Sequence, residues 1–118
     1  MKKIAILRCL KSTENCTGAS CLQVFNAKSA FFERYLDEDI QLVAFLTCNG
    51  CEEMQFTGEA GLEEKIERLL KLGTDIVHIG MCCETRVSGP QPKKCEHIVT
   101  LAALFQAQHL EVVWGTHY

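Results

Sequence analysis

The segment QLVAFLTCNGC, residues 41–51, constrains the fold more than any other part of the sequence. Its first half contains the uninterrupted apolar run Leu42–Leu46. A run without polar alternation is typical of a parallel strand that helices cover on both faces. The following residues, TCNGC, predict the turn that leaves the carboxyl end of this strand. In open α/β sheets that edge is where ligands bind.

The length and charge of the chain limit the classes of protein to consider. A chain of 118 residues predicts one domain, residues 1–118, that builds its core without disulfides. The net charge of −3 and the pI near 5.8 argue against a nucleic-acid partner and against an anionic membrane surface. Arg8 and Lys11 interrupt the first apolar residues, so we expect a strand there, no signal peptide, and a cytoplasmic protein. Eight cysteines in a reducing compartment favour metal or redox chemistry over disulfides.

The order of apolar patterns predicts the fold class. Strand-like runs alternate with helical stripes, which gives the order β-α-β-α-β-α-β. We therefore expect an α/β fold: a single three-layer domain with a four-stranded parallel sheet in the order 2-1-3-4, flavodoxin-like or Rossmann-like, and helices on both faces. The strands are expected at residues 3–7, 42–46, 75–80 and 110–114, the helices at 20–36, 62–72 and 95–108, a loop at 11–17 and an irregular, proline-containing segment at 84–94.

The cysteines share one kind of position in this predicted fold. Each lies just after a strand or near the start of the following helix, so the topology gathers them at the carboxyl edge of the sheet. They are distributed as follows: Cys9 after the first strand, Cys16 and Cys21 beside the first helix start, Cys48 and Cys51 after the second strand, Cys82 and Cys83 after the third, and Cys95 at the start of the last helix. His97 and His117 lie at the same edge.

This gathering of thiols predicts a metal site. Helix amino termini favour the thiolate, which is the form that binds metal. Neighbouring strands lie about 4.8 Å apart, so residues that close adjacent strands can meet around one ion. Zinc takes four such ligands. We expect zinc, with Cys9, Cys48, Cys51 and Cys82 as the first set of ligands, Cys95, His97 and His117 completing or adjoining the site, and Cys16 and Cys21 as further candidates.

The residues also leave alternatives open. A C-x-x-C motif occurs in iron–sulfur and thiol redox proteins as well as in zinc sites, so a thiol-based redox protein or an iron–sulfur cluster is the second hypothesis. No catalytic residue is assigned, and whether the protein is an enzyme stays open. The oligomeric state is open too. Charged residues in the edge loops could bind a small polar ligand: Glu52, Glu53, Glu84 and Arg86.

Three further residues are assigned structural roles. His78 lies inside an apolar strand, so we expect a hydrogen-bonded core histidine and exclude it as a metal ligand. Cys83 neighbours Cys82 and therefore points to the opposite side. His109 ends a helix, where an imidazole interacts favourably with the helix dipole.

At these positions the chain resembles the CGGC domain family, whose defining motif corresponds to Cys48-Asn49-Gly50-Cys51. The resemblance covers nearly the whole chain and implies zinc binding without an assigned reaction. Two residues depart from the family pattern: Asn49 replaces the first glycine of the motif, and Glu96 stands where the family has proline. The other matching features are Arg8-Cys9, Cys16 with Cys21, residues 45–51, residues 73–78, Cys82, Cys95 with His97, and residues 115–117.

Overall fold

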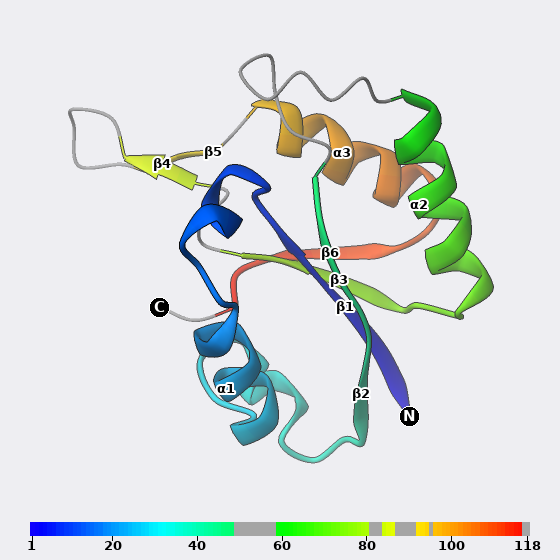
Figure 1. The fold of residues 1–118 in the computed structure, drawn as a ribbon. Helices are drawn as coiled ribbons and strands as arrows, with labels where there is room; N and C mark the ends of the chain where they lie inside the picture. Colours follow the sequence, from blue (N-terminus) through cyan, green and yellow to red (C-terminus); the bar gives the residue numbers. More distant parts are fainter. Residues whose placement is uncertain (49–58, 81–83, 87–91, 95, 117–118) are drawn as a thin grey trace.

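The protein is built on a four-stranded parallel sheet. The computed structural model describes residues 1–48, 59–80, 84–86, 92–94 and 96–116. The strand order is β2-β1-β3-β6, which confirms the predicted order 2-1-3-4 (Figure 1). The strands are β1 (Lys2–Arg8), β2 (Ile40–Thr47), β3 (Ile76–Ile79) and β6 (Glu111–Trp114).

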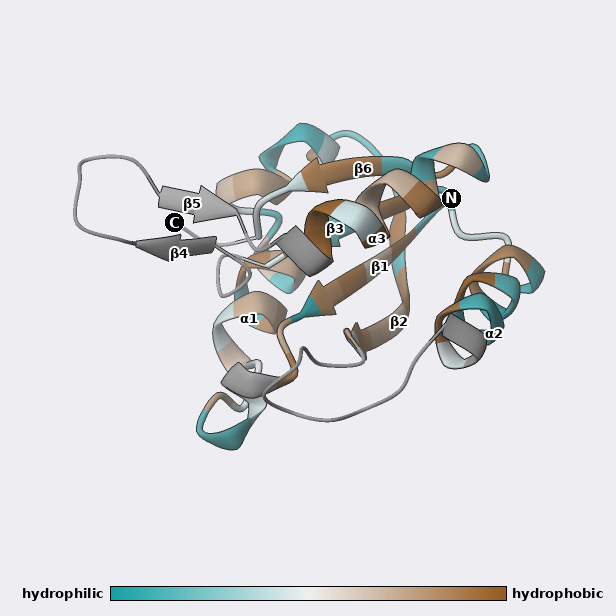
Figure 2. Cartoon of the chain, turned by 90° about the horizontal axis from the view of Figure 1, so that it is seen from above, coloured by the Kyte–Doolittle hydropathy of each residue, from teal (hydrophilic) through white to brown (hydrophobic). Residues whose placement is uncertain are grey.

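Helices cover both faces of this sheet, as the sequence predicts. On one face lie α2 (Glu59–Lys71) and α3 (Glu96–Ala107). On the other lie α1 (Ala19–Ala27) and the 3-10 helix η2 (Ala30–Tyr35). A further 3-10 turn, η1 (Lys11–Glu14), lies in the segment that was predicted to be a loop. The described elements therefore form three layers, with the sheet in the middle (Figures 1 and 2).

The central strand β1 explains why its sequence shows no polar alternation. Its residues Ile4–Leu7 are all fully buried. Ala5 and Leu7 pack into the core below α2 and α3, whereas Ile4 and Ile6 pack into the core beside α1 and η2. Since both faces of the strand are covered, every position must be apolar. Figure 2 shows the hydrophobic residues concentrated along the strands.

The pairing of β1 with β2 contains one irregularity. Ile4 pairs with Leu42, but the next residue, Ala5, pairs with Ala44. Val43 is therefore an extra residue in β2, as in a β-bulge. The pairing then continues in register to Arg8 and Thr47 at the carboxyl end.

The single helix predicted for residues 20–36 is wrong. The chain leaves α1 at Lys28 and enters η2 at Ala30, and both residues have a left-handed backbone with φ of 51°. Ser29 between them is extended. This break turns the chain so that the Phe25 and Phe32 rings meet edge to face, with centroids 5.4 Å apart. Tertiary packing of aromatic rings thus outweighs the local helical pattern.

The irregular segment predicted for residues 84–94 is also corrected. Its described parts form a two-stranded antiparallel sheet of β4 (Glu84–Arg86) and β5 (Pro92–Lys94). Pro92 is the first residue of β5, a position where a strand tolerates a residue without an N–H group. The irregular segment was predicted because proline interrupts the interior of helices and strands, but Pro92 lies at the first position of its strand.

Candidate metal site

Two of the predicted ligands leave adjacent strands at the same point. The last pair in the register of β1 with β2 is Arg8 with Thr47, and the residues that follow this pair are Cys9 and Cys48. The Cys48 N–H donates to the Arg8 carbonyl over 3.0 Å, which fixes the two chains together at this end. Both cysteines pack against the core below α2 and α3. The structure therefore brings Cys9 and Cys48 together at the carboxyl edge.

The sulfur of Cys48 is in a polar contact inside an otherwise apolar environment. The Leu10 N–H lies 3.3 Å from Cys48 Sγ and donates to it. The cysteine is 8% exposed. This backbone N–H is the hydrogen-bond partner of the buried sulfur, which is a weak acceptor.

Lys65 on α2 adds a positive charge to this environment. Its ammonium group donates to the Thr47 carbonyl over 2.7 Å, one residue before Cys48. Partial burial lowers the pKa of Lys65 below its usual range, and the neighbouring Cys48 acts in the opposite direction. Sequence reasoning missed Lys65, because it was read as part of the polar face of its helix. Its spacing of four residues from the buried Leu69 is the signal that places it beside the apolar stripe.

The thiols of Cys16 and Cys21 have different surroundings from this pair. Cys16 is exposed, and its sulfur accepts a hydrogen bond from the Gly18 N–H over 3.4 Å. Cys21 is buried in the core on the α1 face, with its sulfur 3.3 Å from Thr116 Oγ1. Of the four cysteines with described side chains, Cys9 and Cys48 therefore share one face of the sheet and Cys21 lies on the other.

Arg8 connects the Cys16 loop to the sheet edge. Its guanidinium lies over the Phe45 ring, 4.3 Å from the ring centroid, and donates to the Cys16 carbonyl over 3.4 Å. A cation over an aromatic face contributes roughly 0.5–2 kcal/mol. Arg8 thus holds the loop after β1 against the second strand, close to the point where Cys9 and Cys48 emerge.

The structure does not describe the side chains of the remaining predicted ligands. His97 lies in the first turn of α3, but only its backbone is described. Within the described residues no group of three or more Cys, His, Asp or Glu side chains is arranged to hold a metal ion. The candidates that lie outside the described residues are Cys51, Cys82, Cys95 and His117, together with Cys83, the weaker candidate of the Cys82–Cys83 pair.

His78 has the structural role that its sequence position predicts. It is fully buried, and its Nδ1–H donates to the Gly115 carbonyl over 2.7 Å. Nε2 is therefore the acceptor, and it receives the Tyr35 hydroxyl over 2.7 Å. Burial lowers the pKa of His78 to about 4. The hydrogen bond to Gly115 acts to raise this pKa, and the positive charge of Arg34 acts to lower it further. Burial likewise raises the pKa of Tyr35 to about 12, so Tyr35 remains a hydroxyl donor.

Two consecutive residues of the segment that follows β6, Gly115 and Thr116, form polar contacts with other parts of the fold. Besides the His78 contact at Gly115, the Thr116 carbonyl accepts from the Phe31 N–H over 3.2 Å, and the Thr116 side chain meets Cys21. The Phe31 ring packs directly on Gly115, whose φ is 150°. The chain therefore arrives at the carboxyl edge in a fixed position.

We expect Gly115→Ala to lower the free energy of unfolding by about 2–4 kcal/mol. A Cβ there would lie 2.5 Å from the Phe31 ring, and the backbone angle is one that alanine rarely adopts. Urea denaturation measures the change. Gly73→Ala is the matched control, because φ there is also positive but the Cβ would meet only the flexible Lys3 side chain. Equal losses for the two variants would contradict the packing argument.

None of the described helices is long and apolar enough to cross a membrane. The fold and the edge geometry define a class: a small α/β protein with cysteines gathered where its parallel strands end. The particular family follows from comparison with known proteins. The sequence pattern of the CGGC domain matches residues 3–117, so the chain belongs to the CGGC domain family.

One relative extends this comparison. An uncharacterised protein of Methanocaldococcus jannaschii is 34% identical over 122 aligned residues, which cover 98% of this chain and 86% of that protein. No solved structure matches the chain.

Proposed function

We propose that this CGGC domain protein binds a metal ion, zinc, through cysteine thiolates at the carboxyl edge of its sheet, in the reducing cytoplasm. The observation that carries the proposal is that Cys9 and Cys48 leave paired strands side by side. Strand spacing of about 4.8 Å allows one ion to reach both sulfurs. The further ligands that zinc needs are available among Cys51, Cys82, Cys95, His97 and His117.

The surroundings of Cys48 fit a thiolate ligand. Two thiolates held close together repel each other, and a positive charge or an N–H donor offsets that repulsion. The Leu10 N–H donates directly to the Cys48 sulfur, and the Lys65 ammonium lies beside it. When bound, zinc would supply two further positive charges between the thiolates. The chain itself holds the sulfurs in place and compensates part of their charge.

The test is the metal content of the protein, purified under anaerobic conditions without a histidine tag. We expect about one equivalent of zinc by elemental analysis, since one tetrahedral site takes one ion. Iron together with acid-labile sulfide would support an iron–sulfur cluster in place of zinc. A total transition-metal content below about 0.2 equivalents would contradict both metal proposals.

A thiol-based redox function is the second candidate, and the Lys65 ammonium beside Cys48 is the observation that favours it. A cation next to a cysteine increases its reactivity as a nucleophile. In this case Cys48 would attack a disulfide substrate and a neighbouring cysteine would resolve the mixed disulfide.

The redox candidate predicts that Lys65→Gln slows alkylation of Cys48 by iodoacetamide in metal-free protein, by roughly fivefold or more. Peptide mass spectrometry after timed labelling follows Cys48 alone. Arg68→Gln is the control, because Arg68 lies one turn further along α2 and pairs with Glu64 instead. Equal labelling rates in the wild type and in Lys65→Gln would contradict this candidate.

A further inference from the structure

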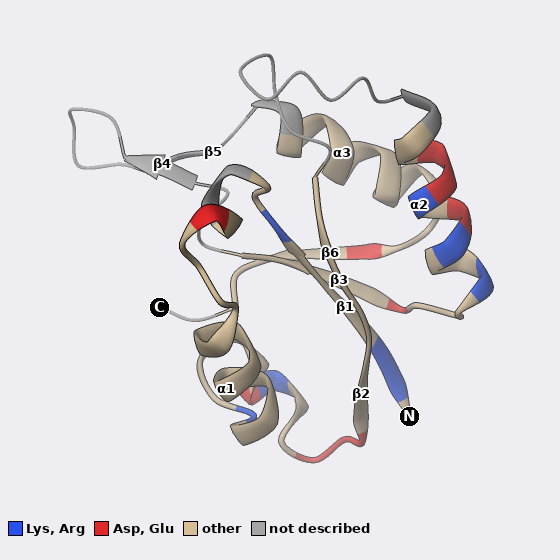
Figure 3. Cartoon of the chain, viewed as in Figure 1, with Lys and Arg blue, Asp and Glu red and all other residues tan. Residues whose placement is uncertain are grey.

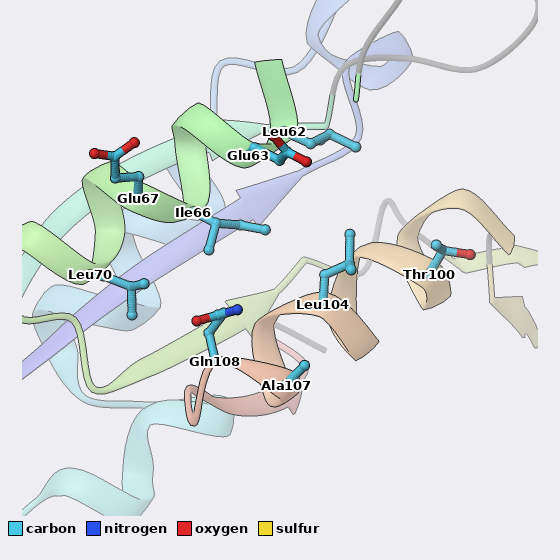
Figure 4. A pocket seen from close by; sticks show the side chains of 9 residues that line it. All are labelled: Leu62, Glu63, Ile66, Glu67, Leu70, Thr100, Leu104, Ala107 and Gln108. Atoms are coloured by element: carbon cyan, nitrogen blue, oxygen red, sulfur yellow. The ribbon is translucent and has the colours of Figure 1, made fainter. Parts of the chain in front are cut away.

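A groove of about 620 Å³ lies between α2 and α3, on the outer side of the layer that these helices form (Figure 4). Leucines from both helices face it although they are not buried: Leu70 and Leu104 are each 42% exposed. Large apolar side chains that gather on one surface mark an interaction site more often than scattered ones do. The residues that line the groove are Leu62, Glu63, Ile66, Glu67, Leu70, Thr100, Leu104, Ala107 and Gln108.

From Ile98 onward α3 contains no charged residue: the sequence from Ile98 to Gln108 has no Lys, Arg, Asp or Glu. Val99 and Leu104 are nevertheless exposed. A helix on the surface of a monomer normally presents charged residues to water. Depletion of charge is instead typical of the centre of a protein interface.

The exposed face of α2 is charged, and its two halves have opposite signs. Figure 3 shows residues of both signs along α2. Glu63 and Glu64 lie in the first half, and Arg68 and Lys71 lie in the last turn, with Glu67 between them. The basic residue of the first half, Lys65, is turned toward the Thr47 carbonyl. If two copies of α2 pack antiparallel, the acidic half of each faces the basic half of the other. The helix is thus complementary in charge to a second copy of itself.

We propose that this groove is the interface of a two-fold symmetric homodimer, in which α2 packs antiparallel on α2 of the second copy and α3 packs antiparallel on α3. Such an interface uses the same patch on both subunits, which is what the self-complementary charge of α2 requires. Leu70 and Leu104 become buried at its centre, Glu64 lies opposite Lys71 of the second copy, and Glu67 lies opposite Arg68 of the second copy.

The ion pairs seen within α2 do not oppose this arrangement. Glu67 and Lys71 pair over 3.2 Å within the helix, and Glu64 pairs with Arg68 over 3.0 Å. Exposed pairs of this kind contribute little, about 0.3–0.5 kcal/mol each, so their exchange for intermolecular pairs costs little.

Sedimentation velocity of the full chain tests the proposal. As the protein concentration rises from about 1 μM to about 500 μM, we expect the wild type to pass from monomer to dimer, because reversible dimers have dissociation constants in this range. A wild type that remains monomeric throughout would overturn the proposal and leave the groove to a different partner. Larger assemblies without a dimer would overturn it as well.

Leu104→Glu locates the interface. A carboxylate at its centre would be buried without a partner, so we expect the dimer dissociation constant to rise by about 100-fold or more. Leu104 is half exposed in the monomer, so the variant should fold, which circular dichroism checks. Leu36→Glu is the matched control: Leu36 is 62% exposed but follows η2 on the other side of the sheet. Equal effects of the two variants, or none, would overturn the assignment.

A charge exchange tests the antiparallel orientation. Glu64→Lys alone and Lys71→Glu alone should each weaken self-association, because each places like charges opposite one another. An equimolar mixture of the two variants should form a heterodimer that native mass spectrometry detects. Failure of the mixture to associate more strongly than either variant would overturn the antiparallel placement of α2.

Discussion

Cys9→Ser combined with Cys48→Ser should remove at least about nine tenths of the bound metal while the protein remains folded, because serine preserves the shape of cysteine but is a poor zinc ligand. We expect the fold to be independent of the ion. The central strand is buried between helices on both faces, unlike a zinc finger, which is unfolded without metal. Elemental analysis of the anaerobically purified variant measures the loss, and far-ultraviolet circular dichroism and urea denaturation measure the fold.

Cys16→Ser is the matched control for this loss. Cys16 is exposed, and its sulfur accepts a hydrogen bond from the Gly18 N–H, so we expect its substitution to leave the metal content near that of the wild type. Full metal content in the double variant would show that the ligands lie elsewhere. Global unfolding of the double variant, with an intact Cys16→Ser, would show that the ion is structural.

The stability of the protein should fall by about 3 kcal/mol between pH 6.5 and pH 4 because of His78 alone. The histidine titrates near 6.5 in the unfolded chain, whereas burial lowers its pKa to about 4 in the folded protein. The unfolded state therefore binds the proton first as the pH falls. The contribution is fully present above pH 6.5 and is lost progressively towards pH 4. Urea denaturation at several pH values measures it.

Carboxylates also titrate in this pH range, but they do so in both the wild type and His78→Gln. The difference between the stabilities of these two proteins at each pH therefore reports the effect of His78. Glutamine retains a donor and an acceptor for the contacts with Gly115 and Tyr35 but does not titrate. The wild type should therefore lose more stability than the variant on acidification. His109→Gln is the control for the substitution itself, because His109 is exposed and lies outside the core. Parallel pH profiles for His78→Gln and the wild type would contradict the assignment.

The arrangement of the sheet could be predicted because its cause is local in the sequence. Both faces of the strands are covered, so the strands appear as unbroken apolar runs, and the right-handed connections between them leave few possible orders. The same reasoning placed His78 in the core, because a residue inside such a run is buried whatever its chemistry. It also placed Cys9 and Cys48 at the same edge, which the register of β1 with β2 confirms.

Other features depend on contacts that one sequence does not encode locally. The break between α1 and η2 places Phe25 against Phe32, and the partners of His78 come from η2 and from the segment after β6. The charge beside Cys48 comes from Lys65, on a helix whose rotation about its axis is set by packing. His78 and its partners, like Lys65 and Cys48, are far apart in the sequence, and only the folded chain shows that they meet.

The extra residue in β2 has a consequence for the two thiols. If β2 kept Val43 but paired with β1 without the bulge, Ala5 would pair with Val43, and Thr47 instead of Cys48 would lie beside Cys9. Every side chain from Ala44 onward would also exchange one face of the sheet for the other. The sequence, with its apolar run and its C-x-x-C motif, would be the same, yet Cys9 and Cys48 would lie on opposite faces. The bulge at Val43 therefore brings the two cysteines to one face of the sheet, although it lies several residues away from both.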